Sequence, residues 1–398
     1  MKASYAIIAA TAALAATGCM PDYNPSNYIE KYRVIGVKAE PPAVVFTPDY
    51  QGVVSLTLLD ALPFRDETQT ALVDPVIESI EWKVCPISAG AAARYACVMD
   101  EIPLSDVSAD GRTASFDGAL VAFGIEMLGS QFDAIVDGLR QAVKFADQCT
   151  KDMLADYDEC LATQTVEQCN PPAFEAFKAC LYQTGLTPVF HVTVKVTDME
   201  LDYSDRPILD DDGRPVMRER VLETYKSVSF GPYGEDLPAN RNPQFHIERS
   251  MEDDPLFAEI LQPGAIVAST HEQIEPVVIQ ACPGQTLGFK AIVPIDSIDR
   301  LTADDGTVAD EYFQLTWYTN RGRFARIRTG SVVAQGKEMD LTNTLEFSAY
   351  ESVGEALITV VMRDEAYGLN IVQFKVNEAP PEYCEELWRN FATAGGVK

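Results

Sequence analysis

The sequence predicts a mostly β protein made of two β-sandwiches, the first of which carries a disulfide-stapled helical hairpin. Three observations lead to this fold class. Short alternating apolar segments recur along the chain without long helices between most of them, which favours sandwiches. Four cysteines are spaced as in an antiparallel helical hairpin, and two tryptophan-containing segments begin similar series of strands. The chain has 398 residues, enough for two or three domains.

The N-terminal segment has the parts of an exported lipoprotein precursor. Lys2 precedes an apolar run over 5–16 that has the length of a signal-peptide core and is too short to span a bilayer. The run leads into Ala16-Thr17-Gly18-Cys19, which resembles the lipobox of bacterial lipoproteins, although that family prefers Leu at the position of Ala16. The resemblance implies a signal peptide over 1–18 and lipidation of Cys19. The alternative is an ordinary secretory signal cut nearby, which would leave Cys19 as an unpaired thiol.

The residues after Cys19 suit a tether. Residues 19–30 are polar and broken by proline, as a spacer between an anchor and a folded part should be. Diacylation with an added N-acyl chain would anchor the protein stably to a membrane. Met20 stands where an aspartate would resemble an inner-membrane retention signal. We therefore expect a cell-envelope protein, lipid-anchored at the outer membrane rather than the inner one.

The net charge restricts the partners. A formal charge of -29 and a pI near 4.4 repel phosphates, which argues against nucleic acid as a partner. No other apolar run approaches the length of a membrane span. The expected partners are the membrane, through the lipid on Cys19, and a protein or polysaccharide of the envelope.

Four cysteines predict their own pairing. Cys149 and Cys160 lie eleven residues apart, as do Cys169 and Cys180. Within one helix such a pair is separated by about 16 Å, while a disulfide needs Cα atoms within about 7 Å. Paired positions in an antiparallel hairpin have a constant sum of residue numbers, and only Cys149–Cys180 with Cys160–Cys169 satisfies this condition. A zinc site is the competing interpretation, but the chain has no Cys-x-x-Cys pair.

The surrounding sequence predicts the hairpin itself. Apolar residues recur at three- and four-residue steps from Phe132 to Cys160, which predicts one amphipathic helix, with a capping signature at Ser130. Asn170-Pro171-Pro172 predicts the start of the returning helix, because proline is tolerated in the first turn. The twin-cysteine spacing resembles the hairpins of the coiled-coil-helix family, but with ten intervening residues instead of nine. We interpret this as similar geometry without kinship.

Strands are expected in two series. Alternating or continuous apolar segments give the first series at 32–39, 53–59, 77–84, 190–196 and 223–230, and the second at 277–281, 287–293, 313–319, 345–349, 357–362 and 371–376.

The two series of strands resemble each other in sequence pattern. The interval from Trp82 to Asp198 exceeds the interval from Trp317 to Asp364 by the length of the helical block, which we place at 118–186. The first sandwich therefore carries the hairpin as an insertion. We expect the first sandwich over 31–250, including the insertion, the second sandwich over 270–377, and a C-terminal tail over 378–398.

Two segments resemble a known class of domain. The stretch WYTNRGRF, which begins at Trp317, and the turn that begins at Asp364 resemble the PKD-type and related immunoglobulin-like repeats of bacterial surface proteins. RVIGVKAEPPAVV, from Arg33, is similar to the first strand of such domains in other bacterial lipoproteins. The resemblance implies two immunoglobulin-like sandwiches. It does not fix a function, since these folds serve adhesion, scaffolding and ligand binding alike.

The other four cysteines complete the disulfide set. Cys85 and Cys97 flank a connection rich in glycine and alanine and are expected to close it. By elimination Cys282 pairs with Cys384. Each such bond typically contributes about 2–4 kcal/mol, mainly by restricting the unfolded chain.

Catalytic motifs are absent from the sequence. The three histidines, His191, His246 and His271, show no ligand spacing, and we find no nucleophile elbow, phosphate loop or dinucleotide fingerprint. We assign no catalytic, cofactor-binding or metal-binding residue. Calcium is kept as an alternative at two acidic loops, which contain Asp202, Asp205, Asp210, Asp211, Asp212 and Gly213 in one case and Asp304, Asp305 and Gly306 in the other.

The sequence thus favours a membrane-anchored binding, adhesion or scaffolding lipoprotein that is not an enzyme. The alternative is a hydrolase that acts on envelope or extracellular polymers through carboxylates that the sequence does not identify.

Overall fold

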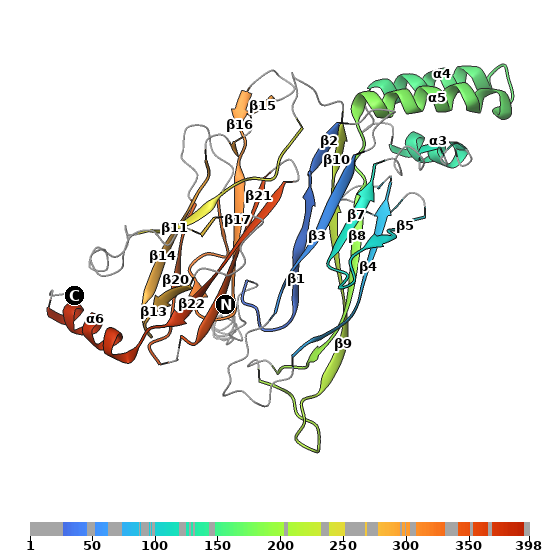
Figure 1. Ribbon diagram of the computed structural model, residues 1–398. Helices are drawn as coiled ribbons and strands as arrows, with labels where there is room; N and C mark the ends of the chain where they lie inside the picture. The colour runs from blue at the N-terminus through green and yellow to red at the C-terminus, as the bar shows by residue number, and fades with distance from the viewer. Residues whose placement is uncertain are drawn as a thin grey trace, which may run out of the picture.

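The protein is mostly β, with several antiparallel sheets and four disulfides (Figure 1). The structure is a computed structural model. It describes residues 27–45, 52–62, 74–86, 88, 95, 97, 100–118, 125–126, 129, 132–142, 148–202, 206–231, 239–250, 267–268, 278–294, 297–298, 300–302, 308–330, 341–350, 353–364 and 368–393. The signal peptide expected over 1–18 and Cys19 lie outside the described residues.

The first half of the chain forms two four-stranded sheets that share one core. One sheet has the order β1-β3-β7-β6, with strands β1 (Arg33–Glu40), β3 (Val53–Ala61), β7 (Thr113–Asp117) and β6 (Asp106–Val107). The other has the order β5-β4-β8-β9, with strands β5 (Ile102–Pro103), β4 (Val76–Cys85), β8 (Val189–Met199) and β9 (Met217–Ser227). A short parallel pair joins β2 (Ala43–Val45) to β10 (Ser229–Gly231).

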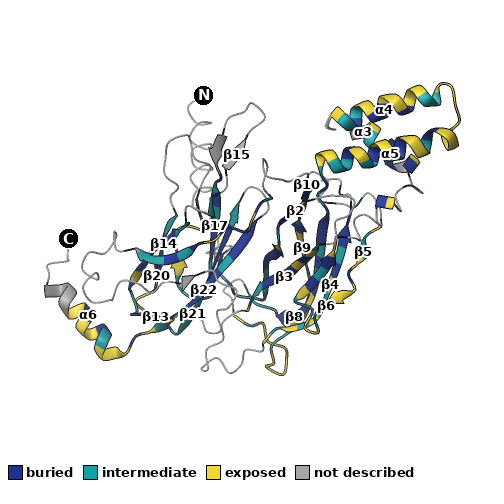
Figure 2. Cartoon of the chain, turned by 45° about the horizontal axis from the view of Figure 1, so that its top comes forward, coloured by how far each residue is buried: buried dark blue, intermediate teal, exposed yellow. Residues whose placement is uncertain are grey.

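Alternation along the strands fills this core. In β8 every second residue from Phe190 to Val196 is at most 1% exposed, because successive side chains of a strand point to opposite faces. They meet Trp82 from β4, which is buried and whose indole N–H donates to the Gly111 carbonyl at 2.7 Å. Figure 2 shows the buried positions concentrated where the sheets face each other. The expected strands at 53–59, 77–84 and 190–196 are thus present, each extended by a few residues.

The second half repeats the arrangement with two five-stranded sheets. One has the order β12-β11-β14-β20-β18, with strands β12 (Val267–Ala268), β11 (His246–Ser250), β14 (Thr286–Ile292), β20 (Thr342–Glu346) and β18 (Arg323–Phe324). The other has the order β13-β22-β21-β17-β19, with strands β13 (Val278–Ala281), β22 (Leu369–Glu378), β21 (Glu355–Asp364), β17 (Phe313–Thr319) and β19 (Arg328–Thr329). A separate pair contains β15 (Arg300–Thr302) and β16 (Val308–Asp310). Trp317 is fully buried at the centre, and its indole N–H donates to Thr329 Oγ1 at 2.8 Å.

The α-helices α3 to α6 of the described residues occupy two places. Between β7 and β8 the chain forms α3 (Phe132–Ala142), α4 (Gln148–Leu161) and α5 (Val166–Thr184), and α6 (Pro381–Thr393) ends the described chain. The single helix predicted from Phe132 to Cys160 is wrong, because α3 and α4 are separate helices that lie in different places (Figure 1). The periodic apolar pattern continues across both helices because both turn their apolar faces to the same core.

The predicted start of the returning helix is also wrong. We placed it at Asn170-Pro171-Pro172, but α5 begins at Val166 and both prolines lie inside it. Thr165 precedes the helix, and its N–H donates to Gln168 Oε1 at 3.2 Å. This capping interaction, which satisfies an end group of the helix, starts α5 one turn earlier than the prolines do.

Three expected boundaries change as well. β11 pairs with β14 of the second half, so the first domain does not extend to residue 250. Residues 27–30, expected in the tether, include the buried Asn27 and Ile29. The expected tail over 378–398 contains α6, which the Cys282–Cys384 disulfide ties to the second half.

The two halves meet along a seam with an apolar centre. Ile29, Ile35 and Leu59 of the first half pack in one cluster with Val361 and Leu369 of the second. All five side chains are at most 8% exposed. Because this apolar area is removed from water only while the halves are joined, its burial stabilises their mutual placement.

Polar side chains surround the seam. The Asn242 amide donates to the Ala39 carbonyl at 2.7 Å, and its oxygen accepts the Leu369 N–H at 2.8 Å, so one side chain binds the backbone of both halves. Lys38 Nζ donates to Asn370 Oδ1 at 3.2 Å across the same boundary. Such bonds have direction, so they fix the angle between the halves as well as their contact.

The N-terminal segment crosses the seam before it reaches β1. Ile29 N–H donates to the Thr319 carbonyl at 2.7 Å, Thr319 N–H donates to the Asn27 carbonyl at 3.0 Å, and the Asn27 amide donates to the Trp317 carbonyl. The chain therefore runs beside β17 of the second half and then becomes the first strand of the first half.

Lys226 at the seam predicts an unusual pH dependence of stability. It is 7% exposed, and burial lowers its pKa from 10.5 to about 8, an effect that Asp364 partly offsets and Arg363 and Lys38 reinforce. Between pH 8 and 10.5 the unfolded state binds more protons than the folded state, so the free energy of unfolding should rise with pH across this window.

We expect Lys226→Met to remove that rise and to stabilise the protein below pH 8 by up to about 3 kcal/mol. Urea unfolding of both proteins at pH 7 and pH 9.5 measures the effect. A variant that keeps the wild-type pH dependence would show that Lys226 is not the titrating group.

Candidate binding surface

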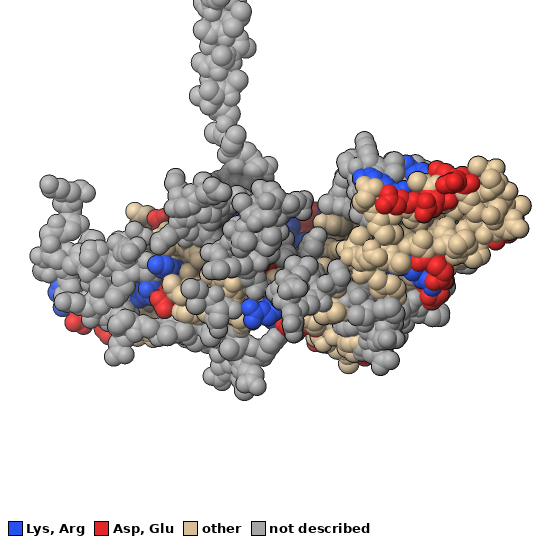
Figure 3. Space-filling view, turned by 90° about the horizontal axis from the view of Figure 1, so that it is seen from above, with Lys and Arg blue, Asp and Glu red and all other residues tan. Residues whose placement is uncertain are grey.

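The helices α3, α4 and α5 form a unit that projects from one end of the first half (Figures 1 and 3). Two disulfides join the antiparallel pair α4 and α5. They are Cys149–Cys180 and Cys160–Cys169, with Cα atoms 5.6 and 5.8 Å apart, and they are the pairs that the constant sum predicts. We call α4, α5 and their connection the hairpin.

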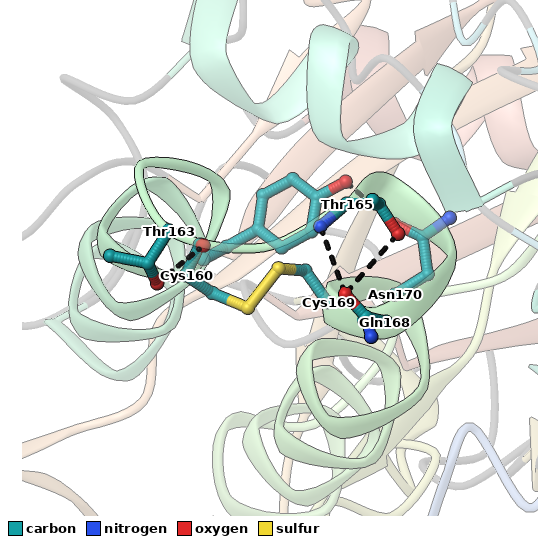
Figure 4. The surroundings of a disulfide bond; sticks show 7 residues. Cys160, Thr163, Thr165, Gln168, Cys169 and Asn170 are labelled. Atoms are coloured by element: carbon teal, nitrogen blue, oxygen red, sulfur yellow. Dashed lines mark hydrogen bonds between the residues drawn. A yellow bond between two sulfur atoms is a disulfide. The ribbon is translucent and has the colours of Figure 1, made fainter.

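The tip of the hairpin combines a disulfide with helix-end hydrogen bonds (Figure 4). Cys160 lies near the end of α4 and Cys169 in the first turns of α5. Thr163 Oγ1 donates to the Cys160 carbonyl at 3.2 Å, and the Thr165 N–H bond to Gln168 begins the next helix. The connection is therefore held at both helix ends.

An aromatic cluster fills the space between the hairpin and α3. Phe132 of α3 is 1% exposed and meets Tyr157 of α4 and Phe174 and Phe177 of α5 at ring-centroid distances of 5.5 to 6.0 Å. This cluster is continuous with the core of the first half's sheets. The helices and the sheets thus share one continuous apolar core.

A polar chain links the same three helices. Tyr157 Oη donates to Asn170 Oδ1 at 2.6 Å, and the Asn170 amide donates to Asp133 Oδ1 at 2.8 Å. Burial, and then the nearby Asp133 carboxylate, raise the pKa of the Tyr157 phenol. The phenol therefore keeps its proton and its role as donor.

Lys178 adds a second link. Its ammonium lies 2.8 Å from Glu126 and 2.9 Å from Glu175, and these hydrogen bonds raise its pKa. It also lies over the Phe174 ring, 5.2 Å from the centroid. Exposed ion pairs contribute little individually, so their value here is to fix side chains on the outside of α5.

The base of the hairpin is tied to the sheets. Leu186 and Phe230 exchange backbone hydrogen bonds of 2.6 and 2.7 Å directly after α5. Gly185, which follows α5 and precedes Leu186, has a φ of 88°, and a Cβ there would lie 2.6 Å from the Phe230 carbonyl oxygen, so only glycine fits. The hairpin therefore leaves the sheets at a fixed angle.

The outer surface of the hairpin is acidic along α4. Asp152, Asp156, Asp158 and Glu159 are all exposed, and Figure 3 shows the acidic side chains gathered on the projecting end. Asp158 pairs with Arg140 of α3, while Asp152 accepts a hydrogen bond from Gln148. The α4 side of the hairpin therefore presents a negatively charged surface on a helix that two disulfides hold in place.

The acidic loops use their carboxylates locally where the structure describes them. Asp202 accepts hydrogen bonds from the Arg206 N–H and guanidinium, and Asp210 accepts the N–H groups of Asp212 and Arg214. Within the described part of the chain no three His, Cys, Asp or Glu side chains converge as metal ligands. Asp205 and the loop with Asp304, Asp305 and Gly306 lie outside it.

His191 makes a structural contact on the outer face of the β4-β8-β9 sheet. Its Nδ1 pairs with the Glu101 carboxylate, and its ring meets Tyr225 edge-on at 4.6 Å. Its Nε2 is buried and has no hydrogen-bond partner among the described residues. Because a general base must reach its substrate, this enclosed nitrogen is poorly placed for catalysis.

The remaining disulfides stand at the positions that the sequence predicts. Cys85–Cys97 closes a local connection after β4, with its Cα atoms 5.4 Å apart. Cys282–Cys384 joins the start of the second half to α6, with its Cα atoms 5.6 Å apart. None of the helices in the described residues combines the length and apolar character that crossing a membrane requires.

Sequence reasoning missed Asn170 and Asn242, the two amides that organise the helices and the seam. A single asparagine belongs to no repeating pattern that would reveal its role in the sequence, because its hydrogen-bond partners lie far away in the chain. Asn170 did stand out as part of a proline motif, but its contacts with Tyr157 and Asp133 follow only from the packing of α3.

Comparison with known proteins adds little. No protein family and no curated protein matches the chain. Among solved structures, a trypsin-activated alpha-2-macroglobulin from Escherichia coli is similar at 12% identity with a TM-score of 0.16, over 89% of this chain and 17% of that one. This chain thus spans less than a fifth of that protein, and so low a TM-score supports no argument about fold or function.

The two hairpin disulfides should differ in their effect on stability. The residues of Cys149–Cys180 are 31 positions apart in the sequence, and those of Cys160–Cys169 are 9 positions apart. The first disulfide therefore closes the longer loop. Because loop closure restricts the unfolded chain more for the longer loop, replacing the first pair by serines should cost about 4 kcal/mol and the second about 3 kcal/mol. Urea unfolding of the two double variants, followed by circular dichroism, measures both costs. The reverse order would contradict the prediction.

Proposed function

We propose that this chain is a bacterial lipoprotein, lipidated at Cys19 and held in the cell envelope as a binding, adhesion or scaffolding module. In this proposal it has two immunoglobulin-like sandwiches, the first carrying residues 118–186 as a helical insertion. The outer membrane is the proposed location, and an envelope protein or polysaccharide is the proposed partner.

The observation that carries the proposal is the state of the cysteines. The chain has nine, and all eight besides Cys19 are paired in disulfides. Disulfides on this scale are typical of exported proteins, because the bacterial cytosol keeps thiols reduced. The odd cysteine is the one that follows the apolar N-terminal run and resembles a lipobox, which supports lipidation over a structural role.

The arrangement of the sheets supports immunoglobulin-like domains. Each half has two facing sheets, and a buried tryptophan on a central strand, Trp82 or Trp317, lies in each core. The helices leave the first half after β7 and return at β8, with their ends at the same edge of the sheets. This is how an insertion in a loop of a sandwich would be attached.

The topology also supports display of the hairpin away from the anchor. The N-terminal segment enters at the start of β1, whereas the hairpin base contacts β10, which pairs with β2 just beyond the end of β1. β1 spans eight residues, or about 26 Å. A lipid at Cys19 would therefore hold one end of the first half at the membrane and direct the hairpin outward.

Replacing Cys19 by alanine should release the protein from membranes. We expect the wild-type protein to stay in the membrane pellet after alkaline carbonate washing and to incorporate labelled palmitate, and Cys19→Ala to do neither. As a matched control, the double variant Cys85→Ser with Cys97→Ser removes a structural disulfide and should stay anchored. A Cys19→Ala protein that resists carbonate extraction would overturn the lipoprotein proposal.

Charge reversal on α4 tests whether the hairpin contacts a partner. Asp156→Lys with Glu159→Lys changes an exposed face and should shift the free energy of unfolding by no more than about 0.5 kcal/mol. We expect a photo-crosslinker at Ala155 to capture an envelope partner in the wild type and at least tenfold less in this variant. The same reversal at Glu382 and Glu386 of α6 serves as the control. Equal capture by all three proteins would show that the acidic side chains of α4 do not recognise the partner, and no capture by the wild type would show that the α4 face contacts none.

A further inference from the structure

The second half carries a basic surface, although the chain as a whole is strongly acidic. Residues 321–328 include four arginines, while the formal charge of the chain is -29. Arg323 and Arg326 lie on the outer side of the sheet that contains β14, β20 and β18, and Lys290 of β14 lies on the same side. We call this outer side of the three strands the basic face.

The register of the strands arranges the basic face in three rows. Read from β14 to β18, the rows are Lys290 with Thr342, Gly288 with Thr344 and Ala325, and Thr286 with Glu346 and Arg323. These residues point outward, because the alternate residues of the same strands, such as Leu345, are buried in the core. The middle row has the smallest side chains. Two rows that contain cations therefore flank a row over which a ligand can approach the sheet closely.

The cations on this surface outnumber the carboxylates. Lys290 and Arg323 are exposed, and among the described residues no carboxylate lies within ion-pairing distance of either. Two acidic residues share the surface. Glu346 lies opposite Arg323, and Glu248 lies opposite Lys290 and is hydrogen-bonded to His246 Nε2 at 3.0 Å. The basic face is therefore locally positive, in contrast to the chain as a whole.

The backbone that carries the arginines is held by both sheets of the second half. Phe324 is buried against Trp317, with ring centroids 5.5 Å apart. The Asn343 side chain accepts the Arg326 N–H at 3.1 Å and donates to the Arg326 carbonyl at 2.7 Å. Arg326 Nη2 also donates to the Thr342 carbonyl at 2.7 Å. These bonds fix the backbone before a ligand arrives, which lowers the ordering cost of binding.

The composition of the basic face indicates the class of ligand. Arginine and lysine bind carboxylates and phosphates, and arginine does so through paired hydrogen bonds. Four strand residues separate the row of Lys290 from the row of Arg323, or about 13 Å, which suits a chain of repeated negative groups better than one small anion. The Thr344 hydroxyl can both donate and accept hydrogen bonds, as sugar hydroxyls require. An acidic polysaccharide meets these conditions together.

The negative charge of the rest of the chain permits such binding at physiological salt. The Debye length is about 8 Å at 0.15 M ionic strength, so carboxylates farther away act only weakly on a ligand at the basic face. The formal charge of -29 therefore argues against polyanion binding over the surface at large, but a local group of cations can still bind one.

We propose that the basic face binds an acidic polysaccharide of the cell envelope. Carboxylates of the polysaccharide pair with Lys290, Arg323 and Arg326, and its sugar rings lie over the row that contains Thr344. This inference rests on the proposed role as a binding module and names the class of one partner; it does not depend on the lipid or on the hairpin.

Isothermal titration calorimetry of the full-length protein in detergent tests the proposal. The probe is an oligogalacturonate of about ten sugars, titrated at 0.15 M salt. We expect saturable binding that is lost at 1 M salt, where the Debye length falls to about 3 Å. Arg323→Gln and Lys290→Gln should each weaken binding about fivefold, and the double variant at least about tenfold, since charge-assisted bonds are lost. Lys290→Arg keeps the charge and should keep the affinity.

A matched variant separates the basic face from the overall charge. Lys195 is exposed on β8 of the first half, so Lys195→Gln removes the same charge as Lys290→Gln at a distant site. Its affinity for the oligogalacturonate should equal that of the wild type. Equal weakening by Lys195→Gln and Lys290→Gln would overturn the proposal, as would an unchanged affinity in the double variant.

Three further ligands test the assignment to an acidic polysaccharide. The methyl-esterified form of the same oligogalacturonate is uncharged and should not bind. Inorganic polyphosphate has the charge without the sugar rings and should bind several-fold more weakly, and the soluble lipid dihexanoyl-phosphatidylglycerol should not compete. Equal binding of the ester or of polyphosphate, or competition by the lipid, would overturn the proposal.

The failures of the two proposals can be told apart. A wild-type protein that binds no oligogalacturonate, while its hairpin still captures a partner, would overturn this inference and leave the proposed function in place. Failure of the lipoprotein proposal would appear as membrane retention of Cys19→Ala, with oligogalacturonate binding intact.

Discussion

The seam between the two halves sets the position of every other feature. Its apolar centre holds the halves together, and the Asn242 side chain fixes their angle because it binds the backbone of both. The hairpin stands on the first half and α6 on the second, so the placement of these two elements relative to each other depends on this one contact region. Burial of Lys226 there lowers its pKa, so we expect its charged form to cost stability at neutral pH.

The sequence predicted those structural features that show either a repeating pattern of apolar residues or a geometric constraint on pairing. Alternation predicted β8, because one face of this strand is buried and the pattern repeats every second residue. A continuous apolar segment predicted β21, which is buried on both faces from Ile358 to Met362. Pairing of Cys149 with Cys180 followed from helix geometry alone. The interruption between α3 and α4 could not be predicted in this way, since one apolar stripe serves both helices.

Other features depended on contacts between distant residues. The sequence of β11 is short and charged, and it becomes a strand only because β14 supplies the partner. The helix α6 lies in the segment expected to be a tail, and its buried residues Cys384 and Leu387 find their partner in Cys282, about a hundred residues earlier in the chain.

The path of residues 27–29 has a mechanical consequence. These residues run parallel to β17, held by the bonds of Ile29 and Asn27 to Thr319 and Trp317, before the chain enters β1. A pull along the N-terminal segment would load these hydrogen bonds together, in shear, before it reached the sheets of the first half. The segment thus ties the first half to the second across the seam. Force applied through the N-terminus would therefore act first on the second half, although that half comes later in the sequence.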